Sequence, residues 1–150
     1  MSFSIVLVEP EIPHNTGAVG RICVGLGIPL HLVQPLGFKI TRKAVQRSGL
    51  DYWDNLDLRI HASWPAFLES EAPASMTFMS TKGSRSLYDV QFDPGGYLVF
   101  GSESRGFPSE FYDDYSDQLC LIPMPGEHAR SLNLSNAVAV AAYEAHRQLS

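Results

Sequence analysis

Three polar loops contain the residues that could do chemistry, and each follows a short apolar run. The first runs from Glu9 to Arg21 (EPEIPHNTGAVGR), the second is Gly101 to Gly106 (GSESRG), and the third spans Ile122 to Asn136. Glycines at both ends of GSESRG permit positive φ and let a ligand approach the backbone closely. The third loop leads into an Ala- and Val-rich helical pattern, whose first N–H groups lack internal partners. These features favour a site for a polar ligand.

Several common catalytic motifs are absent from the sequence. No GxGxxG follows an apolar run, no Walker A pattern occurs, and GSESRG has four residues between its glycines, unlike a nucleophile elbow. The five histidines show no ligand pairing such as HExxH, so we expect no metal. Plainer interpretations stay open: GSESRG as a surface turn, Arg21 as an exposed helix arginine, and Asn133 or Asn136 as a helix cap.

Composition indicates one domain over residues 1–150 with an ordinary core. The chain is 45% hydrophobic and has a net charge of −5, which argues against general nucleic-acid binding. Four cations lie close together without an acid among them, and they form either a solvated face or a local basic patch; they are Lys39, Arg42, Lys43 and Arg47.

Targeting and redox signals point to the cytoplasm. Cys23 and Cys120 lie in apolar surroundings without CxxC spacing, which favours buried, reduced thiols. The N-terminal residues lack the basic region of a signal peptide, and no apolar run is long enough to span a bilayer.

Strands and helices alternate along the chain. The predicted strands are Phe3–Val8, Leu30–Val33, Leu58–His61, Met76–Ser80, Tyr97–Phe100 and Leu119–Ile122. The predicted helices run from a cap at Asn15 or Thr16 to Leu26, over Arg42–Ser48 after a Thr41 cap, over Trp64–Glu69, from Pro108 to Tyr115, and over Leu134–Leu149. This order predicts an α/β domain with a mostly parallel sheet, in which ligands bind at the carboxyl ends of the strands.

At three motifs the chain resembles the SPOUT methyltransferases, and in particular the small bacterial tRNA (cytidine/uridine) wobble-position 2′-O-methyltransferases. The motifs are EPEIPHNTGAVGR, FGSESRGFP (Phe100–Pro108), and IPM followed by RSLNLSNAVAVAAYEA (Arg130–Ala145). The resemblance covers essentially the whole chain. It implies an α/β fold with a C-terminal trefoil knot, in which small residues such as Ala137, Ala139, Ala141 and Ala142 let the last helix pass close to its neighbours. It also implies bound S-adenosylmethionine (SAM) and a homodimer whose two chains build each site.

The resemblance also assigns roles to individual residues. The implied cofactor contacts are Met79, Ser80, Gly101, Glu103, Gly106, Ile122, Met124, Ser131, Leu132 and Asn133, with backbone groups of Ile122 and Leu132 facing the adenine. The implied catalytic residues are Arg21 and Asn15. The implied tRNA contacts are Lys82, Arg105, Arg130, Arg42, Lys43 and Arg47.

The implied reaction is methyl transfer to the ribose 2′-oxygen of tRNA nucleotide 34, in the anticodon stem-loop of leucine tRNAs. Arg21 acts there either as a base or through its charge; a protonated guanidinium has no acceptor, which favours the second role. Two alternatives stay open: a SAM- and RNA-binding protein without catalysis, and a methyltransferase acting on ribosomal RNA.

Overall fold

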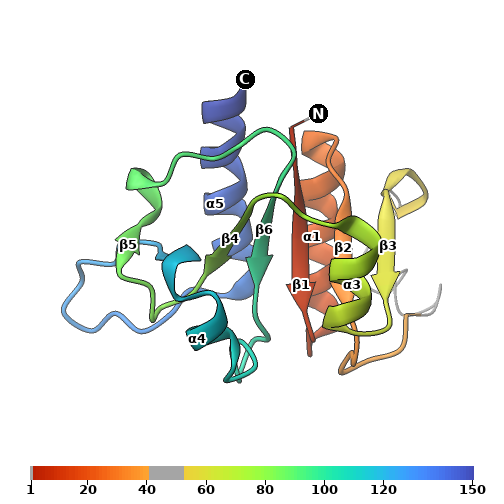
Figure 1. The fold of residues 1–150 in the computed structure, drawn as a ribbon, viewed down its shortest axis with the longest axis horizontal. Coiled ribbons are helices and arrows are strands. Elements are labelled where there is room, and N and C mark those ends of the chain that lie inside the picture. The colour runs from red at the N-terminus through yellow and green to blue at the C-terminus, as the bar shows by residue number, and fades with distance from the viewer. Residues whose placement is uncertain (1, 41–52) are drawn as a thin grey trace.

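The computed structural model describes residues 2–40 and 53–150, and a parallel sheet lies at its centre (Figure 1). The strands are β1 (Phe3–Val8), β2 (Leu30–Val33), β3 (Leu58–His61), β4 (Met76–Met79), β5 (Arg85–Ser86), β6 (Gly96–Phe100) and β7 (Leu119–Leu121). In the described part they form one seven-stranded sheet in the order β3-β2-β1-β6-β4-β7-β5, and each pairing between neighbours is parallel. The α/β class and the six predicted strands are confirmed; β5 has only two residues and gave no signal in the sequence.

Side-chain alternation along the strands divides the core between the two faces of the sheet. In β1, Phe3, Ile5 and Leu7 join the core that includes residues of α1 (Pro13–Leu26) and α5 (Leu134–Leu149). Val6 and Val8 join the opposite core, with residues of α3 (Trp64–Glu71) and α4 (Phe111–Asp114). Strands buried on both faces appear in the sequence as continuous apolar runs.

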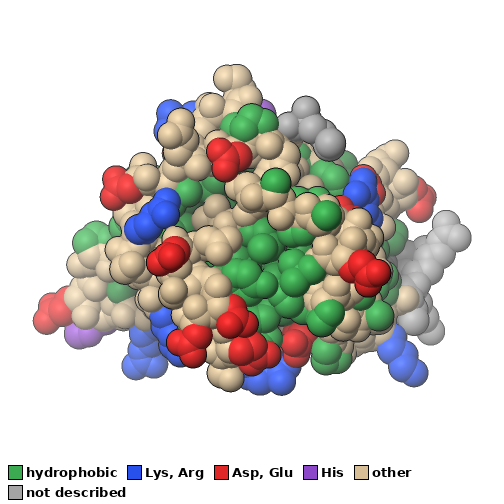
Figure 2. Space-filling model, viewed as in Figure 1, with side chains coloured by type: hydrophobic (Ala, Val, Ile, Leu, Met, Phe, Trp, Pro, Cys, Tyr) green, Lys and Arg blue, Asp and Glu red, His purple; other side chains and the backbone are tan. Residues whose placement is uncertain are grey.

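The face that carries α3 and α4 is less completely covered than the face that carries α1 and α5. α3 and α4 have only 8 and 4 residues, against 14 and 16 for α1 and α5. Figure 2 shows apolar side chains at the surface in the middle of this face, with charged side chains around them. Partly buried residues that pack on this core include Trp64, Met76 and Tyr115.

Two predicted helix starts are wrong. α1 begins at Pro13, with Ile12 as its N-cap, and not after a cap at Asn15 or Thr16; both residues are buried inside the helix. Pro13 fits because the first helical position needs no N–H. α4 begins at Phe111, because Pro108 starts a turn in which the Phe111 N–H donates to the Pro108 carbonyl at 3.0 Å. The helix predicted over Arg42–Ser48, with its Thr41 cap, lies outside the described residues.

The last helix has the predicted bounds and the predicted packing. Asn133 caps α5, since its Oδ1 accepts from the Ser135 N–H at 2.9 Å. Ala141, Ala142 and Ala145 are fully buried, whereas Ala137 and Ala139 are only half-buried, and α5 packs against α1. Small residues therefore allow the close approach that the sequence suggested. The trefoil knot stays a prediction.

The two cysteines are buried free thiols, as expected. Burial raises the pKa of the Cys23 thiol to about 12 and that of the Cys120 thiol to about 11. Both are therefore protonated and unreactive at neutral pH. Among the helices of the described residues, none is long and apolar enough to cross a membrane.

Candidate active site

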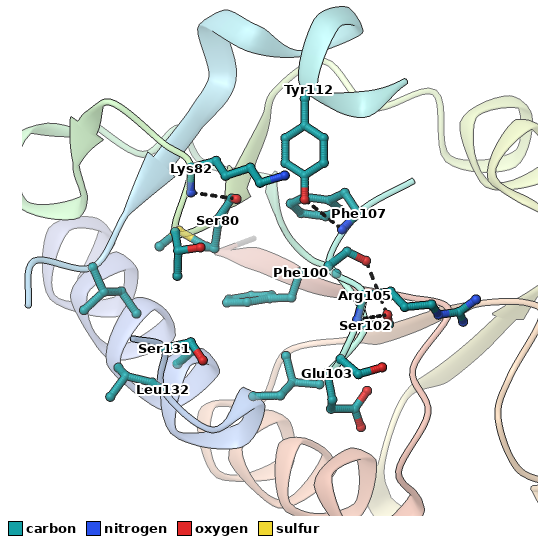
Figure 3. Close-up of a pocket in the computed structure, with 18 of the residues that line it drawn as sticks. Ser80, Lys82, Phe100, Ser102, Glu103, Arg105, Phe107, Tyr112, Ser131 and Leu132 are labelled. Atoms are coloured by element: carbon teal, nitrogen blue, oxygen red, sulfur yellow. Dashed lines mark hydrogen bonds between the residues drawn. The ribbon is translucent and has the colours of Figure 1, made fainter. Parts of the chain in front are cut away.

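A cavity of about 330 Å³ lies where the loops that follow β4, β6 and β7 meet the start of α5 (Figure 3). Its size is that of a small-molecule site. Nine of the ten residues expected to contact a cofactor line it: Met79, Ser80, Gly101, Glu103, Gly106, Ile122, Met124, Ser131 and Leu132. Asn133, the tenth, is not among the lining residues. The structure thus brings together residues that are more than 50 positions apart in the sequence.

Eight further lining residues were not predicted as site residues from the sequence; they are Thr81, Phe100, Ser102, Ser104, Phe107, Tyr112, Leu134 and Ala137. Lys82 and Arg105, which were expected to meet tRNA, also line the cavity. Six of the eight, all except Thr81 and Tyr112, lie inside the quoted motifs and could have been chosen from them. Tyr112 lies on α4, beyond the motif, and gave no such signal.

The loop of Gly101 to Gly106 folds back on itself at the end of β6. The Ser102 N–H donates to the Gly106 carbonyl at 3.0 Å, and the Gly106 N–H donates to the Ser102 carbonyl at 3.0 Å. Gly106 has a φ of 69°, as glycine permits. Gly101 is not among the described positive-φ residues; a Cβ there would lie 2.5 Å from the Gly106 carbonyl carbon. Positive φ at Gly101 was therefore a wrong expectation, and this glycine serves the loop's own backbone packing.

Glu103 supplies the cap that α1 lacks in its own sequence. Its carboxylate accepts from the backbone N–H groups of Glu11 and Ile12, each at 2.8 Å. It also accepts from the Asn15 amide at 3.3 Å. A carboxylate is favourable at a helix N-terminus because it meets unpaired N–H groups and the positive end of the dipole. Glu103 therefore ties the first loop to the second while also lining the cavity.

Asn15, in the first turn of α1, and Asn133, the N-cap of α5, tie the starts of these two helices together. The Asn133 amide donates to the Asn15 Oδ1 at 3.2 Å. Asn15 is 6% exposed, and its amide is held by Glu103 on the other side. Asn133 thus acts as a helix cap and as a bridge between loops, and its expected cofactor contact has no support in the lining of the cavity.

Glu11, in the first loop, accepts hydrogen bonds from the second loop. The sequence did not predict it as a site residue. The Ser104 N–H and hydroxyl donate to Glu11 Oε1 at 3.0 and 2.7 Å. These bonds, the backbone bond foremost, lower the pKa of the Glu11 carboxyl to about 2. Glu11 and Glu103 therefore cross-link the two loops in both directions, with both carboxylates accepting hydrogen bonds.

The expected cations fall into three groups. Lys82 and Arg105 line the cavity. Arg21 on α1 and Arg130 are exposed and are not among its lining residues. Arg42, Lys43 and Arg47 lie outside the described residues. Within the described part, one chain therefore places two of the expected cations at its own cavity.

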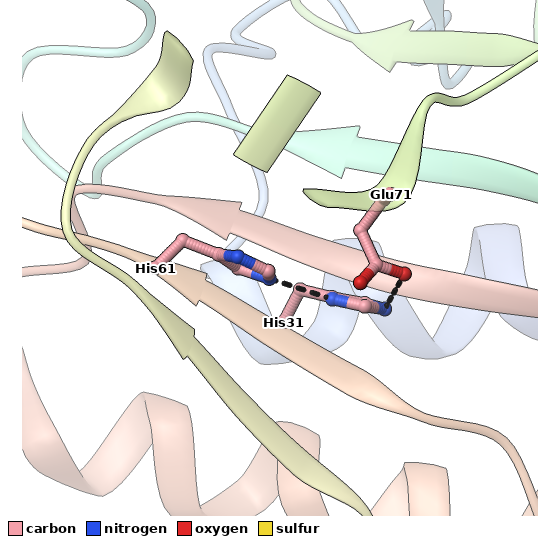
Figure 4. A group of neighbouring side chains, drawn as sticks. All are labelled: His31, His61 and Glu71. Atoms are coloured by element: carbon pink, nitrogen blue, oxygen red, sulfur yellow. Dashed lines mark hydrogen bonds and ion pairs between the residues drawn. The ribbon is translucent and has the colours of Figure 1, made fainter. Parts of the chain in front are cut away.

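A second polar cluster consists of His31, His61 and Glu71 (Figure 4), where the two histidines are buried and Glu71, the last residue of α3, is half-buried. The histidines lie on β2 and β3, on the other side of β1 from the cavity. Its potential ligand atoms lie within 4.8 Å of one another. The residues form a row, with His31 Nδ1 3.0 Å from His61 Nε2 and His31 Nε2 3.8 Å from Glu71 Oε1. Arg59 and Tyr97 already donate to Glu71 Oε1. We interpret the row as a structural cluster, and the expectation of no metal stays a prediction.

This cluster makes stability depend on pH. Burial, opposed by the nearby Glu71 charge, lowers the pKa of His31 from 6.5 to about 4. Between these values the unfolded chain binds more protons than the folded one, so the free energy of unfolding falls as pH falls from 6.5 towards 4, by roughly 3 kcal/mol from His31. Urea unfolding at several pH values measures how steeply the free energy of unfolding depends on pH.

His31→Gln should make this dependence weaker, and the exposed His128→Gln should not. Equal dependence in the wild type and both variants would contradict the assignment of the effect to His31.

The chain is similar to a known protein family and to characterised relatives. The family model described as the SpoU rRNA methylase family matches residues 2–143. The chain is 47% identical to a curated tRNA (cytidine(34)-2′-O)-methyltransferase of Saccharophagus degradans, over 98% of this chain and 96% of the relative. It is 44% identical to the enzyme of that name in Escherichia coli K12, over 97% and 93%.

A solved structure described as giving insights into the 2-OH methylation of C/U34 on tRNA matches with a TM-score of 0.91. It is 50% identical to this chain, and the match covers 98% of this chain and 95% of that one. A SAM-bound rRNA methyltransferase from Sinorhizobium meliloti shares the fold alone, with 23% identity and a TM-score of 0.84 over 99% of this chain and 57% of that one. The parallel sheet, the three joined loops and these similarities agree: the chain belongs to the SpoU methylase family.

Proposed function

We propose that this protein is one methyltransferase domain that transfers a methyl group from SAM to the ribose 2′-oxygen of tRNA nucleotide 34, a cytidine or modified uridine. The observation that carries the proposal is the cavity at the carboxyl ends of β4, β6 and β7. The loops after β6 and β7 are two of the three that the sequence singled out, whereas the first, Glu9 to Arg21, does not line the cavity. The curated relatives named for this reaction support it, at 44–47% identity over nearly their whole length. Leucine tRNAs are the proposed substrates.

The lining of the cavity fits SAM, which combines a flat base with polar groups. The apolar side chains of Phe100, Ile122 and Leu132 suit the flat base, and the hydroxyls of Ser80 and Ser131 suit the polar groups. Backbone groups of Ile122 and Leu132 would bind the adenine. Bound SAM supplies a methyl group on a sulfonium, already activated for displacement by the ribose oxygen, so the protein's main task is alignment, which can contribute up to roughly 7–11 kcal/mol.

Arg21 would act through its charge. A guanidinium stays protonated at neutral pH and has no acceptor, so it cannot take the proton of the ribose hydroxyl. It can stabilise the negative charge that develops on the 2′-oxygen, or hold a neighbouring phosphate. Asn15 would act indirectly, because its amide is engaged by Glu103 and Asn133 and so fixes the first turn of α1, the helix that carries Arg21.

A homodimer would bring Arg21 to a cavity. Arg21 is exposed on α1 and does not line the cavity of its own chain, so we propose that it completes the cavity of the partner. α5 offers an apolar contact surface beside α1, since Val140 and Tyr143 are 38% and 54% exposed. Exposed apolar side chains that lie one turn apart on a helix are typical of an interface.

Tyr143→Asp should therefore break the dimer. A charge in the apolar interface would lose its water without gaining a partner. Light scattering should give about twice 16.5 kDa for the wild type and about 16.5 kDa for the variant, with loss of methyl transfer. Tyr88→Asp, at a tyrosine that is 64% exposed on another element, is the control and should remain dimeric. A monomeric wild type, or a dimeric Tyr143→Asp, would contradict this arrangement.

The anticodon stem-loop would meet Lys82 and Arg105 at the mouth of the cavity. Arg130, Arg42, Lys43 and Arg47 would provide an outer basic surface. Phosphate contacts give affinity that falls with salt, and unpaired anticodon bases give specificity. A cytoplasmic location follows from this substrate.

Methyl transfer from labelled SAM tests the proposal against its two alternatives. The substrates are bulk bacterial tRNA that lacks wobble 2′-O-methylation and, in parallel, unmodified ribosomal RNA. The proposal requires incorporation into tRNA only. Incorporation into ribosomal RNA alone would identify the other methyltransferase activity, and tight tRNA binding without incorporation at any salt concentration would indicate a non-catalytic RNA-binding protein.

A further inference from the structure

Tyr112 contacts two walls of the cavity at once. It lies on α4, lines the cavity, and stands between the loop that contains Lys82 and the loop of Gly101 to Gly106 (Figure 3). The Lys82 ammonium lies 4.3 Å from the centre of the Tyr112 ring. This is well within the range of a cation–π interaction. An exposed lysine, otherwise free to adopt many rotamers, is thereby directed towards the mouth of the cavity.

The hydroxyl of Tyr112 stabilises the other wall, the loop of Gly101 to Gly106. It accepts a hydrogen bond from the Phe107 N–H at 3.2 Å, at the point where the loop of Gly101 to Gly106 ends. A Cβ on Gly106 would lie 2.8 Å from this hydroxyl, so the hydroxyl occupies the space that the glycine leaves. Phe107 is buried, and without this bond its N–H would lose the partner that the structure gives it.

Tyr112 is held in a fixed position by the packing of its neighbours, although α4 is short. A four-residue helix has little stability of its own. The residues on either side hold it: Phe111 is buried against Phe107 and Trp64, and the Tyr115 ring stacks on Phe78 at 4.3 Å. Tyr112 can therefore transmit a fixed position to both loops.

We propose that Tyr112 is a positioning residue, whose ring holds the Lys82 ammonium for a tRNA phosphate and whose hydroxyl holds the loop that binds the cofactor. The inference rests on the proposed function, because it assumes that the cavity binds SAM and that Lys82 meets tRNA. It assigns separate tasks to the two parts of one side chain, and these tasks can be separated by mutation.

The test measures two affinities in four variants: Tyr112→Phe, Tyr112→Leu, Lys82→Met and the double variant Tyr112→Leu/Lys82→Met. Affinity for S-adenosylhomocysteine (SAH), the product of SAM, is measured by calorimetry, and affinity for tRNA by fluorescence anisotropy at one fixed salt concentration. Tyr112→Phe keeps the ring and should weaken SAH binding about fivefold, with tRNA affinity within twofold of the wild type. Tyr112→Leu should in addition weaken tRNA binding about twofold to fivefold.

The double variant is the decisive comparison. If the ring acts by holding Lys82, the double variant binds tRNA no more weakly than Lys82→Met alone. Additive losses, or a Tyr112→Leu variant with unchanged affinities, would overturn the inference and leave the proposed function intact. If the wild type bound neither SAH nor tRNA, both the inference and the proposed function would be overturned. Tyr88→Leu, at an exposed tyrosine outside the cavity lining, controls for loss of a surface tyrosine, and thermal unfolding confirms that each variant is folded.

Discussion

Arg21→Ala is expected to lower kcat by about 100- to 1000-fold while SAH affinity stays within twofold of the wild type. The size follows from the loss of one group that stabilises developing negative charge in an active site. SAH affinity should be preserved because the proposed contacts of Arg21 are the 2′-oxygen or a phosphate of tRNA, and SAH binding involves neither. Single-turnover methyl transfer and calorimetry measure the two quantities separately.

Arg21→Lys sharpens the same test. Lysine keeps the charge but loses the planar, bidentate donor geometry, so partial activity would indicate that charge matters most. A loss as large as in Arg21→Ala would assign the role to phosphate binding by the guanidinium fork. Equal losses of kcat and SAH affinity in Arg21→Ala would contradict a catalytic role and make Arg21 a structural residue.

Gly101→Ala is expected to weaken SAH binding by about 10- to 100-fold. The new Cβ would lie 2.5 Å from the Gly106 carbonyl carbon and 2.7 Å from the Phe107 nitrogen, and both are backbone atoms. The loop must open to admit it, which disturbs the paired hydrogen bonds of Ser102 and Gly106. Overpacking of this kind costs about 1–3 kcal/mol. Calorimetric titration with SAH measures the effect without requiring turnover.

Gly126→Ala is the matched control for this substitution. A Cβ on Gly126 would meet nothing within 4 Å, and Gly126 is not a positive-φ residue. It also belongs to the third loop without lining the cavity. The SAH affinity of Gly126→Ala should therefore equal that of the wild type. If Gly101→Ala bound SAH as tightly as Gly126→Ala, the cavity at the end of β6 would not be the cofactor site.

Local sequence patterns predicted the strands well, because buried parallel strands are short runs of apolar residues. Phe3–Val8 and Leu30–Val33 have the expected bounds. α5 was equally clear, because Asn133 is a strong cap and the alanines that follow it suit close packing. Two walls of the cavity could also be predicted, since polar loops directly follow β6 and β7. The loop after β1 was expected to be a third wall but does not line the cavity.

Long-range contacts set the features that the sequence did not predict. α1 begins at Pro13, a residue favoured at the first helical position, but the cap comes from Glu103, 92 and 91 residues away from the two N–H groups that it accepts from. No local pattern could show that Asn15 bonds to Asn133 rather than capping a helix. The row of His31, His61 and Glu71 is formed by two neighbouring strands and a helix, so only the strand order brings it together.

Tyr112 illustrates the same limit at the active site. Its position on α4 follows from aromatic packing with residues of α3 and β4, which no motif records. The contact with Lys82 depends on that packing. Side chains that tune the cavity can therefore lie outside the motifs that define it.

The most direct test of the proposed function is the position of the transferred methyl group. The protein is incubated with SAM and bacterial tRNA that lacks wobble 2′-O-methylation, and the tRNA is digested and mapped by mass spectrometry. We expect one new methyl group, on the ribose of nucleotide 34 of leucine tRNAs, and none with Arg21→Ala. A methyl group at another nucleotide, on a base, or on no tRNA at all would contradict the proposal.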